Sequence, residues 1–234
     1  MALIGFSTGA LCRDDLQAAV AVARDSNTRA IELSALRLRE LRPLLDFVQL
    51  ADLSSFTYVS VHAPTDYSRD QEREVAKLLA GVALERQWSV VVHPDCISDT
   101  EAWKPLDRWL TPENMDKRKP VGRTVEELAP FFEAFPSAAF CFDIGHAHQV
   151  DTSMTEAYRL LREFGARVCQ LHVSEVSSSS KHARITERVL QSFLEVAHRL
   201  PPDVPVILET PVTPEEALLE MEKAARLLTT PALT

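Results

Sequence analysis

The sequence of 234 residues lacks most features of secreted, membrane-spanning or redox-active proteins. Its four cysteines, Cys12, Cys96, Cys141 and Cys169, include no C-x-x-C pair. No apolar run approaches the ~18 residues that a transmembrane helix needs, and the first six residues lack the charged start of a signal peptide. These absences predict reduced thiols and a cytoplasmic protein with no membrane association.

An excess of basic residues is also missing. The chain has 25 Lys and Arg against 34 Asp and Glu, which gives a formal net charge of -9. This balance argues against a surface built wholly for nucleic acid or anionic lipid, although it leaves room for a local basic patch. The first apolar run is not followed by a glycine-rich phosphate fingerprint, which disfavours a nucleotide-binding open sheet.

The chain does contain a regular alternation of short apolar runs and amphipathic segments. The predicted strands cover residues 2–6, 30–33, 58–62, 89–93, 110–115, 138–142, 167–173 and 204–209. The predicted helical segments cover residues 14–23, 36–53, 71–85, 100–110, 124–135, 155–163, 185–200 and 215–228. No linker interrupts the alternation, so we expect a parallel sheet with helices outside. Eight repeats predict an α/β fold with one domain, residues 1–234, in a compact (β/α)8 TIM barrel. An open doubly wound sheet is the competing fold.

The stretch from Phe142 to His148 places one carboxylate and two imidazoles directly after the predicted sixth strand. Asp143 and His146 can both turn toward one ion, and Gly145 between them allows a tight bend of the backbone. The alternative interpretation is a helix N-terminus at which Asp143 is the capping residue and the histidines are incidental.

Other ionisable residues also lie at the ends of predicted strands. The histidines are His62, His93 and His172 on strands three, four and seven, and His182 after strand seven; the acids are Glu32, Glu113, Asp143 and Glu209. In a closed parallel barrel these ends meet at one rim, where active sites are built. A single such histidine is more often a structural hydrogen-bonding residue. Several acids confined to one rim, however, would repel one another without a cation. Imidazole and carboxylate ligands together favour zinc, manganese or iron over calcium.

A basic tract follows Glu113 within ten residues and consists of Lys117, Arg118, Lys119 and Arg123. It is either a solvated loop or, on the rim of a barrel, a site that holds a phosphate or a carboxylate.

The strand-end motifs resemble those of the xylose-isomerase-like barrel superfamily, which contains sugar isomerases, epimerases and endonuclease IV. The resemblance covers strands three to eight. The motifs are His62-Ala63-Pro64, His93-Pro94, Glu113-Asn114, Asp143-Ile144-Gly145-His146, Leu171-His172 and Leu208-Glu209-Thr210-Pro211. The two histidine motifs and the E-T-P sequence are closest to endonuclease IV, whereas D-x-x-H is shared by both branches.

The resemblance implies a site for one to three divalent metal ions, with zinc or manganese expected. Its core ligands would be Glu113, Asp143, His172 and Glu209. His62 and His93, sharing Glu113, would form a second site as in endonuclease IV. A third site would include His146 with His182 as a candidate ligand, but Ser180 stands where endonuclease IV carries a carboxylate.

The first functional hypothesis is a metal-dependent isomerase or epimerase that acts on a small sugar or sugar phosphate. In it, Glu113 and Glu209 exchange a proton with the carbon next to the carbonyl, and His146 orients a hydroxyl. The residues expected to contact the substrate are Glu32, His182 and the basic tract Lys117, Arg118, Lys119 and Arg123.

Two other hypotheses remain open. An endonuclease IV-like phosphodiesterase acting on abasic DNA is favoured by the histidine pair and by E-T-P, but the net acidity, Ser180 and the missing long DNA-gripping loops count against it. The last is a non-catalytic barrel that binds a metal or a ligand. The sequence leaves the sugar, the number of metals and the oligomeric state open.

Overall fold

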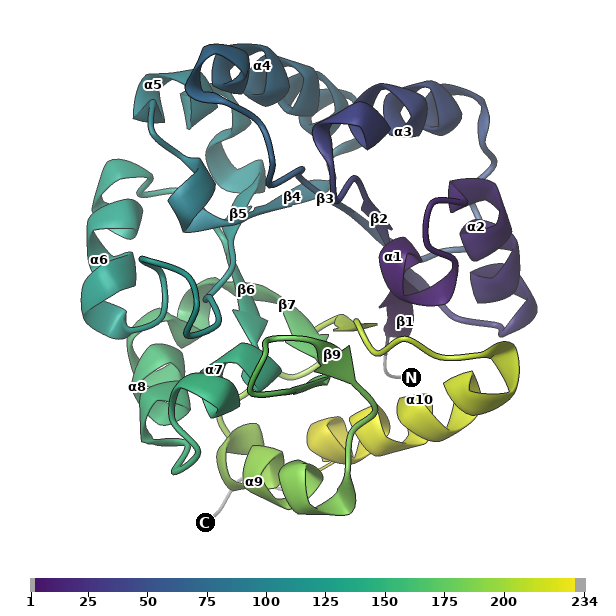
Figure 1. Cartoon of the computed structure of the whole chain (residues 1–234), viewed down its shortest axis with the longest axis vertical. Coiled ribbons are helices and arrows are strands. Elements are labelled where there is room, and N and C mark those ends of the chain that lie inside the picture. The colour runs from purple at the N-terminus through teal and green to yellow at the C-terminus, as the bar shows by residue number, and fades with distance from the viewer. Residues whose placement is uncertain (1–2, 230–234) are drawn as a thin grey trace.

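The computed structural model describes residues 3–229, which form eight parallel strands enclosed by helices (Figure 1). The strands of the barrel are β1 (Ile4–Ser7), β2 (Ala30–Ser34), β3 (Tyr58–His62), β4 (Ser89–Val92), β5 (Leu110–Pro112), β6 (Phe140–Asp143), β7 (Val168–Val173) and β10 (Val206–Leu208). The outer helices are α2 (Leu16–Asp25), α3 (Leu38–Leu50), α4 (Arg69–Arg86), α5 (Thr100–Trp103), α6 (Val125–Ala134), α8 (Thr155–Phe164), α9 (Glu187–Ala197) and α10 (Pro214–Thr229). Short 3-10 turns η1 (Pro94–Cys96), η2 (Lys104–Trp109) and η3 (Gly165–Arg167) complete the connections.

Neighbouring strands pair in parallel in the order β5-β4-β3-β2-β1-β10-β7-β6. The two end strands of this order meet where the Ala139 N–H donates to the Leu110 carbonyl at 3.0 Å and where Glu113 bridges to Cys141. The sheet is therefore a nearly closed barrel, which confirms the predicted (β/α)8 fold. In such a barrel the carboxyl ends of all strands share one rim. Within residues 3–229, no helix is both long enough and apolar enough to cross a membrane.

Side chains alternate between the inside of the barrel and the helices that cover it, as strand geometry requires. On β7, Leu171 and Val173 belong to the hydrophobic core, whereas Gln170 and His172 contact the buried carboxylate of Glu32. The barrel interior below the rim is therefore polar, unlike the branched apolar layers that usually fill TIM barrels.

The hydrophobic core lies between the strands and the outer helices. Phe140 on β6 packs against Phe132 of α6 and Phe164 of α8, with ring centroids 5.8 Å and 6.0 Å away. These aromatic contacts hold both helices against the barrel wall. Helix α6 begins at Val125, and Thr124 caps it as expected, because its side chain accepts a hydrogen bond from the Glu127 N–H.

Several predicted boundaries differ from the observed ones, and three of them are corrected here. The first strand was expected at residues 2–6 but runs Ile4–Ser7, and residue 2 lies outside the described part of the chain. The helix expected from residue 14 begins at Leu16, because Asp15 caps it and Asp14 has a non-helical φ of 64°. The fifth strand, expected at 110–115, ends at Pro112; beyond it, Glu113 forms a single bridge to Cys141, and the Asn114 side chain bonds to the Asp143 backbone.

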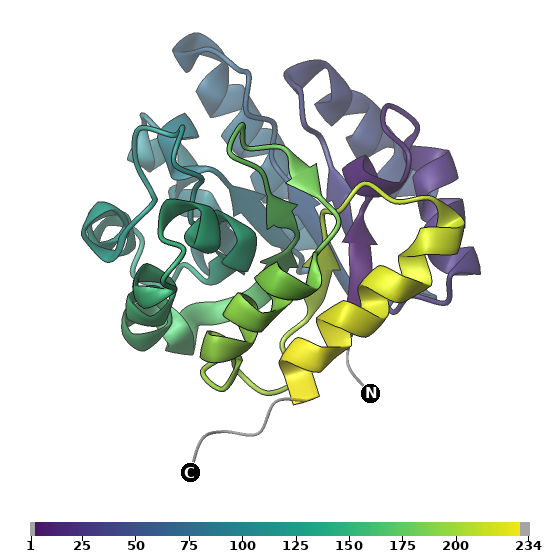
Figure 2. The same cartoon turned by 60° about the horizontal axis from the view of Figure 1, so that its bottom comes forward.

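Two short helices and a hairpin also follow strand ends. Helix α1 (Thr8–Leu11) follows β1 and was not predicted. Helix α7 (Ile144–Val150) begins directly after Asp143, where the alternative interpretation placed a helix N-terminus. Strands β8 (Glu175–Val176) and β9 (His182–Ala183) form a hairpin that projects from the rim (Figure 2). On α7, the His148 ring packs against Phe193 of α9, with centroids 5.7 Å apart, so it belongs to the helix packing.

Candidate metal centre

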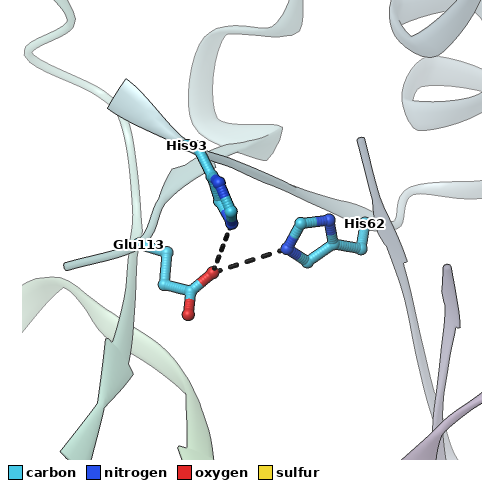
Figure 3. Close-up of side chains that lie close together, drawn as sticks. All are labelled: His62, His93 and Glu113. Atoms are coloured by element: carbon cyan, nitrogen blue, oxygen red, sulfur yellow. Dashed lines mark hydrogen bonds and ion pairs between the residues drawn. The ribbon is translucent and has the colours of Figure 1, made fainter. Parts of the chain in front are cut away.

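Glu113 lies at the centre of the ionisable side chains on the rim and is 1% exposed. Its Oε2 is 3.4 Å from His62 Nε2 and 3.4 Å from His93 Nε2, and both rings point toward it (Figure 3). Its Oε1 is 3.2 Å from His146 Nδ1 and 3.3 Å from His172 Nδ1. Because its two oxygens face different sets of ligands, this carboxylate can bridge two ions.

Four residues from four strand ends form the first ligand group. Glu113, Asp143, His172 and Glu209 each offer one ligand atom, and these atoms all lie within 4.8 Å of one another. Asp143 Oδ2 and Glu209 Oε2 are buried and accept no hydrogen bond within residues 3–229. A buried carboxylate oxygen that accepts no hydrogen bond is costly unless a cation balances it. The group therefore fits a divalent cation that takes mixed oxygen and nitrogen ligands, such as zinc or manganese.

His62, His93 and Glu113 form a second ligand group, again with ligand atoms within 4.8 Å of one another. His62 Nδ1 lies 2.8 Å from the Ala63 carbonyl oxygen, which can only accept a hydrogen bond. This contact places the ring proton on Nδ1 and leaves the Nε2 lone pair facing Glu113, as a metal-ligating histidine requires.

Glu32 lies beneath the metal centre rather than at its opening. Its side chain is fully buried, and its Oε2 lies 3.0 Å from His172 Nε2, 2.6 Å from Gln170 Nε2 and 3.2 Å from Ser60 Oγ. The carboxylate accepts the Nε2 proton of His172, so that Nδ1 is directed at Glu113. The expected contact of Glu32 with substrate does not fit this position, because His172 separates Glu32 from the rim.

Asp143 combines both roles that its sequence context allowed. Its Oδ1 caps α7 by accepting a 2.6 Å hydrogen bond from the His146 N–H, while its Oδ2 accepts no hydrogen bond within residues 3–229 and lies 3.3 Å from His146 Nδ1. The Asn114 amide holds Asp143 in place through two 2.8 Å hydrogen bonds with its backbone. Gly145 is required by close approach, because a Cβ there would lie 2.3 Å from the Ser174 carbonyl oxygen. The sequence did not assign Asn114 a role; its only signal was its position beside Glu113.

Crowding of acids and imidazoles shifts their pKa values. Burial raises the pKa of Glu113, but the neighbouring His172 and His146 outweigh burial and hold it well below its usual range. Burial, with the repulsion of Glu113 and Glu209, raises the pKa of Asp143 well above its usual range despite nearby His146. Burial lowers the pKa of His146, but Asp143 and Glu113 outweigh it and raise that pKa to about 10. The cluster without a cation therefore holds protons that a bound metal would displace.

His182 on the hairpin lies at the edge of this cluster. Its Nδ1 is 3.6 Å from Glu209 Oε2 and 2.7 Å from Ser174 Oγ, and its ring centroid is 5.6 Å from that of His146. Within residues 3–229, the three-residue groups able to hold an ion include neither His146 nor His182. Ser180 Oγ donates a 2.6 Å hydrogen bond to Asp116 Oδ1.

The basic tract expected to hold an anion is largely paired within the protein. The ion pairs are Arg118 with Asp116 (3.2 Å), Lys119 with Asp95 (2.9 Å) and Arg123 with Glu127 (2.5 Å). Lys117 is exposed, and its side chain has no ion pair within residues 3–229. Three of the four cations are therefore already engaged before any substrate arrives.

A cavity of about 840 Å³ opens beside Glu209 and His182. This volume lies in the range of pockets that bind small organic molecules. One residue of the first ligand group, Glu209, thus lines a cavity of the size that holds a small molecule.

No protein-family model matches the chain, and no curated protein matches it. Solved structures do share its fold. The crystal structure of a D-tagatose 3-epimerase-like protein matches with a TM-score of 0.65 and 18% identity, covering 97% of this chain and 97% of that chain. SacUVDE matches with a TM-score of 0.53 and 14% identity, covering 92% and 84%. Thiamine phosphate pyrophosphorylase from Pyrococcus furiosus matches with a TM-score of 0.51 and 12% identity, covering 85% and 82%.

These likenesses establish the fold. The chain is a TIM barrel, as its alternation of strands and helices predicts. The same barrel occurs in neighbours whose names denote unrelated activities, so the function has to be argued from the rim itself.

Proposed function

We propose that this protein is a divalent-metal-dependent isomerase or epimerase of a small sugar. One observation carries the proposal: Glu113 and Glu209 belong to one four-residue ligand group, and Glu209 also lines the cavity of about 840 Å³. Two carboxylates beside a cation and a small-molecule cavity suit proton transfer at a carbon. The name of the D-tagatose 3-epimerase-like neighbour supports the same class of reaction.

Isomerisation and epimerisation beside a carbonyl both need one group that removes a carbon-bound proton and one that returns it. A cation held by Glu113, Asp143, His172 and Glu209 would polarise the carbonyl and the adjacent hydroxyl oxygen. Glu209, at the cavity wall, and Glu113, deeper in the rim, are the pair that moves the proton. Asp143 and His172 hold the geometry.

His146 takes the role of a substrate-binding residue beside this pair. Its Nδ1 donates to the Asn114 carbonyl at 3.0 Å, which fixes the ring and leaves Nε2 for a substrate hydroxyl. His146 is 6% exposed, and its ring centroid lies 5.6 Å from that of His182, which lines the cavity.

The second ligand group favours a second candidate function, hydrolysis of a phosphodiester. His62 and His93 share one oxygen of Glu113, and two ions bridged by a carboxylate can stabilise both the attacking and the leaving oxygen of a phosphate. The net charge of -9 disfavours binding of a DNA polyanion. Hydrolysis of abasic DNA therefore ranks second.

Hydrogen exchange with solvent tests the first function. Protein loaded with manganese or zinc is incubated in deuterated water with a panel of ketoses and their phosphates. We expect deuterium at the carbon next to the carbonyl, together with the epimer or the aldose. Glu209→Gln should reduce exchange by about 10²- to 10⁴-fold, the usual contribution of a general base. Glu195→Gln, an equal charge change on the exposed face of α9, is the matched control.

The same preparation is offered an abasic duplex DNA. Metal-dependent incision of the DNA, without deuteration of any sugar, would reject the isomerase and establish the phosphodiesterase. Deuteration without incision would establish the isomerase.

A further inference from the structure

The cavity beside the metal centre is bordered by two elements that are distant in sequence. One border is α1 with the residues that follow it, and the other is the β8–β9 hairpin. Both lie on the rim face of the barrel, on either side of the segment after β10 (Figure 1). The lining includes Glu209 and His182 from the candidate metal centre and two exposed cations, Arg13 and Lys181.

The charge of Arg13 is not neutralised within the protein. Its side chain forms no ion pair or hydrogen bond with any residue in the range 3–229. The two acids that follow it are engaged elsewhere: Asp14 pairs with Arg37 at 3.1 Å, and Asp15 caps α2. Arg13 therefore presents a free guanidinium to the cavity.

The Lys181 side chain likewise has no ion pair or hydrogen bond within residues 3–229, and its backbone is held in place. Its N–H donates to Ser177 Oγ at 3.0 Å, and its carbonyl accepts from the Ser177 N–H at 3.0 Å. The adjacent Ser180 Oγ accepts from Gln149 Nε2 at 2.8 Å and donates to Asp116 at 2.6 Å. The hairpin is thus anchored to the barrel before any ligand binds, which lowers the entropy lost on binding.

The acids of the cavity do not cancel these two charges. Glu216, which lines the same space, forms an ion pair with Arg184 and accepts a 3.1 Å hydrogen bond from the Thr213 N–H. Glu209 belongs to the ligand group of the metal centre. The cavity therefore has one end that suits a metal and a sugar carbonyl, and two unpaired cations on its walls.

We infer that Arg13 and Lys181 bind an anionic group of the substrate, a phosphate or a carboxylate, while its sugar end reaches Glu209. Guanidinium and ammonium groups form charge-assisted hydrogen bonds with such anions. The inference relies on the proposed function for the sugar end alone. It assigns anion binding to residues outside the tract Lys117–Arg123, whose cations are mostly ion-paired.

Calorimetric titration of manganese-loaded protein tests the assignment. The probes are ribose 5-phosphate and fructose 6-phosphate with their neutral parents, and glucuronate with glucose. We expect at least one charged sugar to bind about tenfold or more tightly than its neutral parent, as one charge-assisted hydrogen bond provides. If the sugar phosphates show this preference, the site binds phosphate; if glucuronate shows it, the site binds carboxylate. Arg13→Gln with Lys181→Gln should reduce its affinity to that of the parent. Lys77→Gln with Arg162→Gln makes the same charge change at exposed, unpaired positions on α4 and α8 and should leave the preference intact.

Three results would overturn the inference. In the first, the wild-type protein shows no preference for any charged sugar. In the second, the double variant Arg13→Gln with Lys181→Gln keeps the preference. In the third, the double variant Lys117→Gln with Arg123→Gln loses the preference. The deuterium assay keeps the two proposals apart. An anion preference that depends on Arg13 and Lys181 but comes with no exchange supports this site and rejects the isomerase. Exchange of neutral sugars without any anion preference does the reverse.

Discussion

Replacement of Glu32 by glutamine tests how the polar interior of the barrel prepares the metal centre. The carboxylate is fully buried, and its Oε2 lies 3.0 Å from His172 Nε2 and 2.6 Å from Gln170 Nε2. Glutamine keeps the shape of the side chain but removes its charge. His172 then loses the acceptor that fixes its tautomer and raises the basicity of Nδ1 toward the metal.

The expected magnitude follows from the nature of this contact. Loss of the partner behind a metal-bound histidine weakens metal binding by about 10- to 100-fold, which corresponds to about 1.4 to 2.8 kcal/mol. In the metal-free protein the change removes the buried partner of His172, whose Nε2 lies 3.0 Å from Glu32. Removing one member of a buried pair leaves the other without compensation and is destabilising. The melting temperature of metal-free Glu32→Gln should therefore be lower than that of the wild type.

Competition with a chromophoric zinc chelator measures the affinity, and thermal unfolding of the metal-free protein measures the stability. Ser60→Ala is the control, because it removes only the 3.2 Å hydrogen bond to the same oxygen and leaves the carboxylate. We expect it to change zinc affinity by about threefold or less, in line with one neutral hydrogen bond. Wild-type zinc affinity in Glu32→Gln would refute the reasoning. A metal-free variant that no longer unfolds cooperatively would show that Glu32 serves the fold instead.

Two further predictions concern the histidines. Changing His62 and His93 together to Ala should lower the zinc content by about one ion per chain, because both rings face the same oxygen of Glu113. Elemental analysis measures the zinc content, and circular dichroism checks that the barrel remains folded. An unchanged zinc content would limit the pair to contact with substrate. Zinc affinity should rise between pH 6.5 and about 10, about tenfold per unit for each proton displaced, because the pKa of His146 is raised from 6.5 to about 10 in the metal-free protein. Across the same window the metal-free protein should lose stability, since a raised pKa stabilises the fold below pH 6.5 and this contribution is lost as pH rises through 10. A flat zinc affinity and a flat melting profile over that range would contradict the titration of His146.

The sequence by itself was sufficient to predict the barrel and where its ionisable residues gather. Alternation of short apolar runs with amphipathic segments is a local property of the chain, and only a parallel sheet covered by helices buries such a pattern. In a closed parallel barrel the carboxyl ends of all strands lie on one rim, so the sequence placed Glu113, Asp143, His172 and Glu209 near one another. The capping function of Asp143 was also visible locally, as one of two alternatives.

Only the tertiary structure decided which partner each polar side chain takes. Glu32 lies 140 positions from His172, and no local pattern indicates that the two meet beneath the rim. The basic tract looked free in the sequence, but Asp95 reaches Lys119 from another strand end. Arg13 and Lys181 carried no signal, because the cavity that joins them exists only after α1 and the β8–β9 hairpin reach the same face. A charged side chain pairs with whatever the closed barrel brings within a few ångströms, and sequence separation does not limit that choice.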